Sequence, residues 1–221
     1  MFIEEKYRRI IAKCPIFAET GRFSEDEILA ALKAEKKQYD KGDLIHKSEE
    51  PFLRFGILLE GSAQACIDDI DGNRMIMAEI GVGSTFGESL CYLKTPDSPV
   101  YVYSSEKSTV LWLSPDIIFS GSDSPLKTLI EQNYTRMLAK RTLSMNTRIQ
   151  VLSKLRLRDR ILTYLSSVAN ENGEKTFSIP LSREDMATYI GANRTALSRE
   201  LSALKNEVII DFYKNTFKIL K

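Results

Sequence analysis

The stretch YIGANRTALSRELSALKNE, residues 189–207, begins with the side chains of this sequence that are best suited to recognition chemistry. Its first turns carry Asn193, Arg194, Thr195, Ser198 and Arg199. Such side chains donate and accept hydrogen bonds at phosphates or base edges, and arginine can pair bidentately with guanine. Polar residues are also common wherever a helix begins, so the stretch by itself leaves DNA contact and helix capping equally open.

The residues around this stretch predict how it is held in place. Apolar side chains replace the polar ones further along, at Leu197, Leu201 and Leu204, as a helix that packs on a core requires. The preceding SREDMATYIG predicts another helix, which Ser182 begins in a capping-box arrangement and Gly191 ends. Together they predict a helix-turn-helix, whose second helix enters the major groove with its N-terminal residues.

The charges of the chain are unevenly divided. Residues 1–135 hold 15 Lys and Arg against 22 Asp and Glu, a net charge of −7, whereas residues 136–221 hold 16 against 8, a net charge of +8. A basic C-terminal part favours a polyanionic partner. The closing VIIDFYKNTFKIL predicts two short strands that turn around Lys214 and Asn215, like a small wing beside the helices.

Length and composition indicate two domains. With 221 residues, 43% of them hydrophobic and 28% charged, the chain can bury two separate cores. No apolar run approaches the roughly 18 residues of a membrane helix, and the N-terminal MFIEEKYRRI is too charged for a secretory signal. Three distant cysteines without a CxxC spacing fit a reducing compartment, so we expect a cytoplasmic protein with no membrane partner.

Residues 41–113 show short β-rich runs separated by glycine turns. The runs are FGILLEG, RMIMAEI, VYVY and STVLWL, and DIDGN is an Asp-Gly hairpin turn before the second of them. Many short strands with glycine turns are typical of a sandwich or barrel, here of the jelly-roll type.

A long helix is predicted from Pro125, because proline suits a first helical turn and neither glycine nor proline follows before about Leu152. Apolar residues recur along it at spacings of three, four and seven: Leu126, Leu129, Ile130, Met137, Leu138, Met145, Ile149 and Leu152. A single apolar seam on so long a helix favours pairing with the same helix of a second subunit. The alternative is a helix that lies across its own sheet.

These motifs resemble the CRP/FNR superfamily of bacterial transcription regulators over nearly the whole chain. The similarity rests on KGDLI, on GILLEGSAQACIDDIDGNRMIMAEIGVGSTFGES and on LSREDMATYIGANRTALSRELSALK, which follow one another in the family's order. The resemblance implies an α+β protein with three parts: an N-terminal β-roll (jelly roll) of the cyclic-nucleotide-binding type at 1–124, a long central dimerisation helix at 125–153, and a C-terminal winged helix-turn-helix at 154–221. It also implies a homodimer that is not an enzyme, binds a pseudo-palindromic site in double-stranded DNA and contacts RNA polymerase.

The resemblance further implies roles for individual residues at the DNA. Arg183 is similar to the arginine that contacts phosphate at the first helix of the motif, and Arg194 and Arg199 are similar to base-reading arginines. Thr195 stands where many members carry an acidic base reader, so an unusual half-site is expected. The remaining residues expected at the DNA are Ser182, Asn193 and Ser198.

The sensor pocket departs from the family pattern. Phe86, Gly87 and Glu88 match the family's Phe-Gly-Glu turn, but Ser98 and Pro99 stand where cAMP-binding members have an Arg-Ser pair. A buried phosphate without a cation loses its hydration with nothing to offset the loss.

Other residues expected near the pocket also differ from those of cAMP-binding members. Lys94 is the one nearby cation, and Met145 replaces the hydroxyl that usually faces adenine. We therefore expect no response to cAMP and no cofactor. An apolar pocket with one carboxylate favours a small neutral or cationic effector of unknown identity. The alternative is that ligand control has been lost and Gly87 and Glu88 serve only as a turn.

Other functions of a β-roll need residues that this sequence lacks. A cupin-type enzyme needs two or three histidines with a carboxylate, but His46 is the only histidine and is expected on a surface loop. Cys14 alone cannot hold an iron–sulfur cluster, and Cys91 is either a packing residue or an oxidation sensor. The remaining alternative is a ligand-binding β-roll protein without a DNA-reading role, but it gives the basic C-terminal helices no function.

Overall fold

The computed structural model describes residues 3–19, 21–68, 70–71, 74–121, 123–179 and 181–220. The chain divides into two compact units, Met1–Ala139 and Lys140–Lys221. The family resemblance implied parts at 1–124, 125–153 and 154–221, and those bounds remain a prediction.

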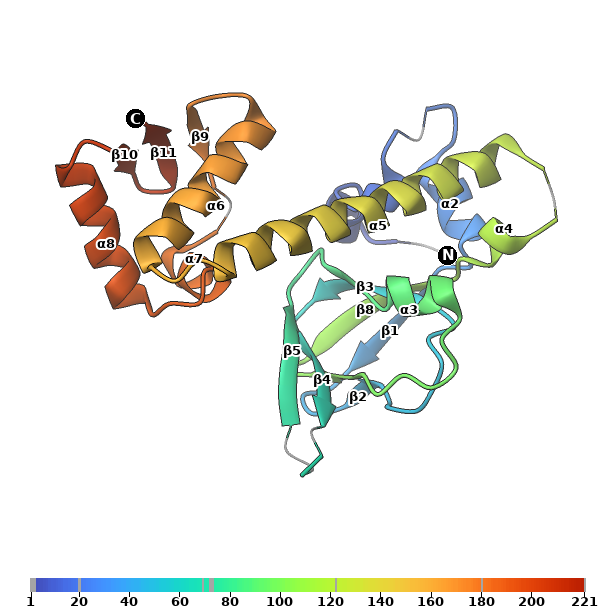
Figure 1. The fold of residues 1–221 in the computed structure, drawn as a ribbon. Coiled ribbons are helices and arrows are strands. Elements are labelled where there is room, and N and C mark those ends of the chain that lie inside the picture. Colours follow the sequence, from blue (N-terminus) through green and yellow to red (C-terminus); the bar gives the residue numbers. More distant parts are fainter. Residues whose placement is uncertain are drawn as a thin grey trace. The chain divides into compact units, whose positions relative to one another are not determined.

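Two four-stranded antiparallel sheets form the body of the first unit (Figure 1). One has the strand order β1-β8-β3-β6 and the other has the order β2-β7-β4-β5. The strands are β1 (Glu35–Tyr39), β2 (Leu44–His46), β3 (Phe55–Glu60), β4 (Ala63–Asp68), β5 (Arg74–Ile80), β6 (Thr85–Phe86), β7 (Tyr101–Ser104) and β8 (Ser108–Leu113). Apolar side chains of both sheets are buried between them, among them Ile57, Val102 and Val110. The predicted β-roll is thereby confirmed.

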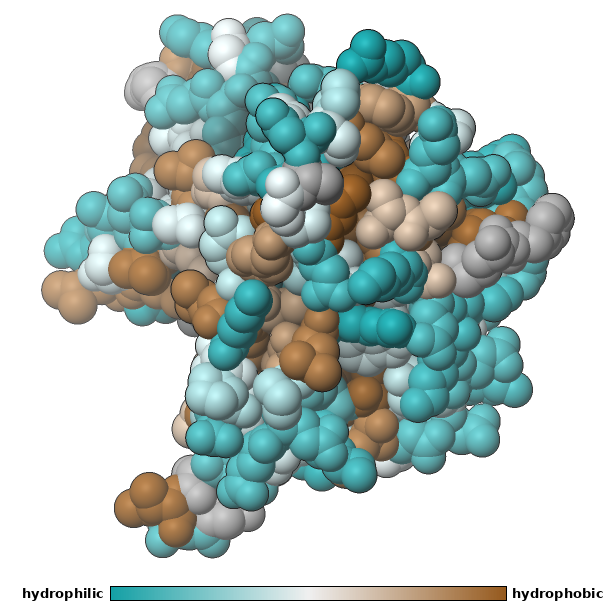
Figure 2. Space-filling view, turned by 90° about the vertical axis from the view of Figure 1, so that its right-hand side faces the viewer, coloured by the Kyte–Doolittle hydropathy of each residue, from teal (hydrophilic) through white to brown (hydrophobic). Residues whose placement is uncertain are grey.

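Strands β4 and β5 form a hairpin, with Ala63 opposite Ile80 and Asp68 opposite Arg74. The Asp-Gly turn predicted at DIDGN includes residues 69, 72 and 73, which lie outside the described residues. Figure 2 shows brown apolar side chains at the projecting lower tip, where this hairpin ends. Ile70, in that turn, is fully exposed.

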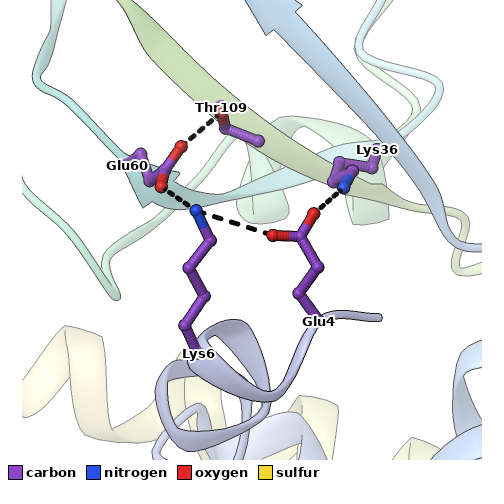
Figure 3. A network of polar contacts seen from close by, with 5 residues as sticks. All are labelled: Glu4, Lys6, Lys36, Glu60 and Thr109. Atoms are coloured by element: carbon purple, nitrogen blue, oxygen red, sulfur yellow. Dashed lines mark hydrogen bonds and ion pairs between the residues drawn. The ribbon is translucent and has the colours of Figure 1, made fainter. Parts of the chain in front are cut away.

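Short helices cover one end of the β-roll: α1 (Glu5–Ile11), the 3-10 helix η1 (Pro15–Phe17) and α2 (Glu25–Ala31). A chain of charged contacts fastens α1 to the sheet, as Figure 3 shows. Lys6 Nζ lies 2.5 Å from Glu60 and 3.5 Å from Glu4, and Lys36 Nζ lies 2.7 Å from Glu4. Thr109 completes the network by donating its hydroxyl to Glu60 at 3.0 Å. These groups are partly exposed, so the network orients α1 more than it stabilises it.

Helix α5 (Pro125–Leu152) is continuous, and its bounds match the predicted ones. The prediction that its whole apolar seam faces a second subunit is wrong for the first half. Ile130, Tyr134 and Met137 are buried in the core of the first unit, because the β-roll and its N-terminal helices leave an apolar face that this half covers. Met145 and Ile149, further along, are 59% and 63% exposed.

In its described residues, 140–179 and 181–220, the second unit holds three further helices and a small sheet of strand order β10-β11-β9. Its elements are α6 (Leu157–Asn172), β9 (Thr176–Ser178), α7 (Arg183–Tyr189), α8 (Arg194–Asn206), β10 (Ile210–Tyr213) and β11 (Thr216–Ile219). The polar loop predicted from residue 170 begins later, because α6 continues to Asn172 and Gly173 ends it in the left-handed conformation at φ 69°. The predicted helix-turn-helix and wing are confirmed.

Within the described ranges, no helix combines the length and the apolar character that crossing a membrane requires. The same part of the chain contains no group of three or more His, Cys, Asp or Glu side chains arranged to hold a metal ion.

Candidate functional sites

Two of the predicted DNA-binding residues are helix caps. The Ser182 hydroxyl accepts a hydrogen bond from the Asp185 backbone N–H at 3.1 Å, and Asp185 accepts one from the Ser182 N–H at 3.3 Å. Asn193 Oδ1 accepts a hydrogen bond from the Ala196 N–H at 2.8 Å and so begins α8. Each cap satisfies backbone donors that the first turn would otherwise leave open, so these side chains fix where the two helices start.

The other predicted contacts of α8 lie together on its exposed face. Leu197, Leu201 and Leu204 are buried in the core of the second unit. Their spacing leaves four polar side chains exposed at the N-terminal end of the opposite face: Arg194, Thr195, Ser198 and Arg199. Arg194 with Ser198, and Thr195 with Arg199, are four residues apart and therefore neighbours on the helix surface. The result is one continuous polar stripe over about two turns.

The turn between α7 and α8 requires a glycine. Gly191 has a φ of 67°, which side chains rarely adopt. A Cβ at this position would also lie 3.0 Å from a methyl carbon of Leu152 and 3.4 Å from the Arg160 guanidinium. Leu152, the last residue of α5, therefore packs closely on this turn, and Val151 is buried in the core of the second unit. The end of α5 belongs to the second unit.

Two arginines of α6 hold the helix-turn-helix, and neither was predicted from the sequence. Arg158 donates to Glu200 at 3.0 Å and to Glu207 at 2.5 Å, so it binds α6 to the middle of α8 and to its C-cap residue. Arg160 donates to the carbonyl of Lys154 at 2.8 Å and to that of Gly191 at 3.1 Å. Arginines on an amphipathic helix are common, and nothing in the local sequence indicates which distant groups they bind.

Arg183 is engaged in a different way from the predicted phosphate contact. Its guanidinium donates to the backbone carbonyl of Lys214 and lies 5.4 Å from the ring centre of Phe212 and 4.9 Å from that of Phe217. Burial beside these rings lowers the pKa of Arg183 from its usual range. The side chain is thus directed onto the wing formed by β10 and β11.

The predicted effector pocket lies in the first unit, around the junction of β6 with α3 (Glu88–Leu93). Phe86 and Glu88 are almost fully buried, and Gly87 between them has a φ of 76°. A Cβ at Gly87 would lie 2.4 Å from the ring of Phe52, so this ring rests directly on the turn. His46 stacks on Phe52 with a ring-centre distance of 3.5 Å.

The position of His46 corrects the prediction of a surface loop. It ends β2 and is half-buried, because its ring covers Phe52 and its Nε2 lies 3.1 Å from the carbonyl of Glu50. Burial lowers the pKa of His46, although the Glu50 carbonyl opposes this effect.

Ser98 and Pro99 border a groove of about 340 Å³. Phe86, Gly87 and Glu88, which form the buried turn, are not among the residues that line this groove. Glu49, Asp68 and Asp97 contribute three carboxylates to its lining. Ser98 is itself fully buried, with its carbonyl accepting from the Glu49 N–H at 2.8 Å and its hydroxyl accepting from the Val100 N–H at 3.2 Å. An anion in this groove would meet like charges.

Met145, the last predicted pocket residue, is on the half of α5 that belongs to the second unit. Its assignment to the pocket remains a prediction.

The buried cysteines have the environment of packing residues. Burial raises the pKa of the Cys91 thiol to about 12 and that of Cys14 to about 11. Because the thiolate is the reactive form, both side chains stay protonated and unreactive at neutral pH.

Comparisons with known proteins agree with this architecture. A family model described as a Crp-like helix-turn-helix domain matches residues 156–221, and one described as a cyclic nucleotide-binding domain matches residues 36–120. The chain is 23% identical over 181 residues to Electron transport regulator A of Shewanella oneidensis, covering 80% of this chain and 71% of that protein.

A second relative matches a shorter segment. The transcriptional activator protein FnrL of Cereibacter sphaeroides is 35% identical over 69 residues, which is 27% of this chain and 28% of that protein. Among solved structures, DNR from Pseudomonas aeruginosa is similar with a TM-score of 0.52 and 19% identity, covering 100% of this chain and 96% of that one. The structural likeness concerns the fold.

Proposed function

The chain is a DNA-binding transcription regulator of the CRP/FNR superfamily, and from this we propose that it acts as a homodimer that reads a pseudo-palindromic site in double-stranded DNA. In this proposal, residues 1–124 are the sensor, 125–153 the dimerisation helix and 154–221 the DNA-binding domain. The protein works in the cytoplasm and contacts RNA polymerase at its promoters.

The polar stripe of α8 is the observation that carries the proposal. Arg194 and Arg199 extend from the exposed face of the helix, while its other face is fixed in the core. A guanidinium can donate two hydrogen bonds to the O6 and N7 of guanine, which makes these two residues the base readers. Thr195 and Ser198 lie between them and suit a base edge or a phosphate.

The exposed half of α5 supports the dimer. Met145 and Ile149 are four residues apart on this half and are 59% and 63% exposed, and Leu152, 39% exposed, follows Met145 by seven residues. Residues at these intervals lie along one face, as in a two-stranded coiled coil. Pairing there would bury apolar surface that the first and second units leave open.

The sensor is proposed to be insensitive to cAMP and cGMP. Three observations support this: Ser98 and Pro99 supply no cation, three carboxylates line the adjoining groove, and the ring of Phe52 occupies the space above Gly87. The effector is then a small neutral or cationic molecule, or ligand control has been lost.

A mobility-shift experiment on genomic DNA fragments tests the proposal. The wild-type protein should retain a subset of fragments in the presence of excess non-specific DNA, and Arg199→Ala should weaken this retention by about 1–3 kcal/mol and relax the base preference. Arg9→Ala is the matched control, since it removes an exposed arginine of α1 in the first unit. Equal retention of all fragments by the wild type would exclude sequence-specific reading.

A further inference from the structure

Helix α8 is joined to its neighbours in the second unit by charged contacts on two sides. On one side, Arg158 of α6 donates to the Glu200 carboxylate at 3.0 Å and to the Glu207 carboxylate at 2.5 Å. On the other side, Lys205 of α8 lies 2.7 Å from Asp211 and donates to a backbone carbonyl of β10 at 3.1 Å. One contact therefore links α8 to α6, and the other links it to the wing.

The helical period places these two contacts on different flanks of α8. At 3.6 residues per turn, Glu200 and Glu207 lie within about 20° of each other around the axis, and Lys205 lies about 140–160° away. The three buried leucines of α8 fall in the narrower sector between these flanks, where they meet the core. Thr195 and Arg199 fall in the wider sector, which is exposed. The charged contacts thus lie on both sides of the face that carries these two residues.

Such contacts restrict the rotation of a helix about its own axis. Burial of apolar surface is non-directional, whereas an N–H donor requires a short distance and a nearly linear geometry. A rotation of about 10° moves a side-chain atom that lies about 5 Å from the helix axis by about 1 Å. A shift of this size takes a donor out of hydrogen-bond range of a base edge. Base reading from α8 therefore depends on its rotation.

The same groups are too exposed to add much to the stability of the fold. The side chains of Arg158 and Glu200 are 33% and 30% exposed, and those of Lys205 and Asp211 are 47% and 56% exposed. Ion pairs with this exposure are screened by water and salt and contribute little to folding. Their removal should leave the domain folded and change how α8 is oriented.

We propose that Arg158 and Lys205 are positioning residues that set base specificity, because they hold α8 at the rotation in which Thr195 and Arg199 meet the base edges. The inference rests on the proposed DNA-binding function and adds to it two residues outside the exposed polar stripe. The carboxylates that accept these contacts then favour specific binding, although a negative charge by itself repels the phosphates of DNA.

The test compares two fluorescein-labelled duplexes at one salt concentration. One is the genomic fragment that the wild type retains most strongly, and the other is a mixed-sequence duplex of the same length. The measured quantity is the specificity ratio, which is the Kd for the mixed-sequence duplex divided by the Kd for the fragment. A change in the charge of the protein or in a phosphate contact affects both duplexes alike and cancels in this ratio.

Glu200→Gln/Glu207→Gln is the most informative variant, because it is nearly isosteric and removes two charges that repel DNA. It should lower the specificity ratio about fivefold or more, the lower end of what one bidentate base contact provides. The mixed-sequence duplex should bind this variant at least as tightly as it binds the wild type. Arg158→Ala should lower the ratio similarly, although it changes the charge in the opposite direction. Glu171→Gln/Glu174→Gln is the matched control, which removes two exposed carboxylates at the C-terminal end of α6 and should keep the wild-type ratio.

The triple variant shows whether Arg158 acts through the two carboxylates. If it does, adding Arg158→Ala to Glu200→Gln/Glu207→Gln should lower the specificity ratio no further. A further decrease would overturn positioning through these carboxylates, because it would mean that Arg158 contributes to specificity by another route.

Lys205→Met tests the other flank, since it keeps an apolar stem and removes the ammonium group. It should lower the specificity ratio, and should lower it further when combined with Arg158→Ala, because the two contacts lie on different flanks. A wild-type ratio in Lys205→Met or in Glu200→Gln/Glu207→Gln would overturn the proposal.

Thermal melting of the same variants distinguishes orientation from folding. Each variant should melt close to the wild type, and a variant that is unfolded at the assay temperature would overturn the proposal, because its contacts would then be needed for the fold itself. A wild-type protein that binds both duplexes with equal affinity would instead refute the proposed function.

Discussion

Single side chains in the helix-turn-helix divide into those that build it and those left exposed. Ser182 and Asn193 cap helices, and Arg183 holds the wing. Arg194 and Arg199 are exposed on the face of α8 that faces away from the core. Residue types alone do not predict which side chains cap a helix and which stay exposed, because a serine or asparagine at a helix start suits capping and DNA contact equally well.

The buried thiols predict a decrease in stability at alkaline pH. The pKa of Cys91 rises from 9.0 to about 12 on folding, so the folded state favours the protonated thiol. This stabilisation is fully present below pH 9 and is lost as the pH rises toward 12. The free energy of unfolding, measured by denaturant titration between pH 8 and 11, should decrease less steeply in Cys91→Ala than in the wild type.

Thiol labelling gives the complementary result. Cys14 and Cys91 should react with a disulfide reagent at pH 8 only after denaturation, since burial keeps both protonated. Rapid labelling of Cys91 in the native protein would contradict a packing role and favour the oxidation sensor.

The residues of the sensor predict how it responds to cyclic nucleotides. Because Ser98 and Pro99 supply no cation and Glu49, Asp68 and Asp97 line the same groove, a cyclic phosphate bound there would meet like charges. Calorimetric titration with cAMP and with cGMP should show no binding heat at millimolar nucleotide. Micromolar affinity for either nucleotide would contradict this account of the pocket.

At the scale of elements, β-rich runs, glycine turns and helical periodicity in the sequence predicted most of the fold. The β-rich runs with glycine turns at residues 55–61, 74–80 and 108–113 correspond to β3, β5 and β8, and the uninterrupted pattern from Pro125 corresponds to α5. Periodicity identifies an apolar face but does not identify what covers it. For this reason the sequence favoured a dimer face for the seam of α5 and left packing on the chain's own sheet as the alternative, which is what Ile130 and Met137 do.

The two halves of α5 should therefore respond differently to a charge. Met145→Glu/Ile149→Glu should give a folded monomer, because both side chains are more than half exposed and their change would disrupt only the proposed pairing. Met137→Glu should instead destabilise the first unit by several kcal/mol, because it buries a carboxylate in the core. Molar mass from light scattering and thermal melting separate the two effects.

The control for the dimer is a pair on the polar side of the same turns. Asn146→Glu/Gln150→Glu adds the same charge at exposed polar positions and should leave the dimer intact. A wild-type protein that is monomeric at micromolar concentration would contradict the proposed pairing of two α5 helices.

Contacts between distant elements could not be predicted from the sequence. The carbonyl that Arg183 reaches lies 31 residues away, and the ring that rests on Gly87 belongs to Phe52, 35 residues earlier in the chain. Such partners are set by how helices and strands pack, and no local pattern marks them.

At the scale of the whole molecule, a basic DNA-binding part follows an acidic β-roll on one chain. Residues 136–221 carry the net charge of +8, and they include every residue proposed to touch DNA. Two such parts in a dimer can each occupy one half-site, and the spacing of the half-sites then reports the symmetry of the protein.

Selection of binding sites from a pool of random duplexes tests this central claim most directly. Sequencing of the bound DNA should yield an inverted repeat whose half-sites are centred about 10–10.5 base pairs apart, or a multiple of that spacing, so that both α8 helices enter major grooves on one side of the duplex. Enrichment of a single unrepeated motif, or of no motif at all, would contradict a symmetric dimer that reads DNA through α8.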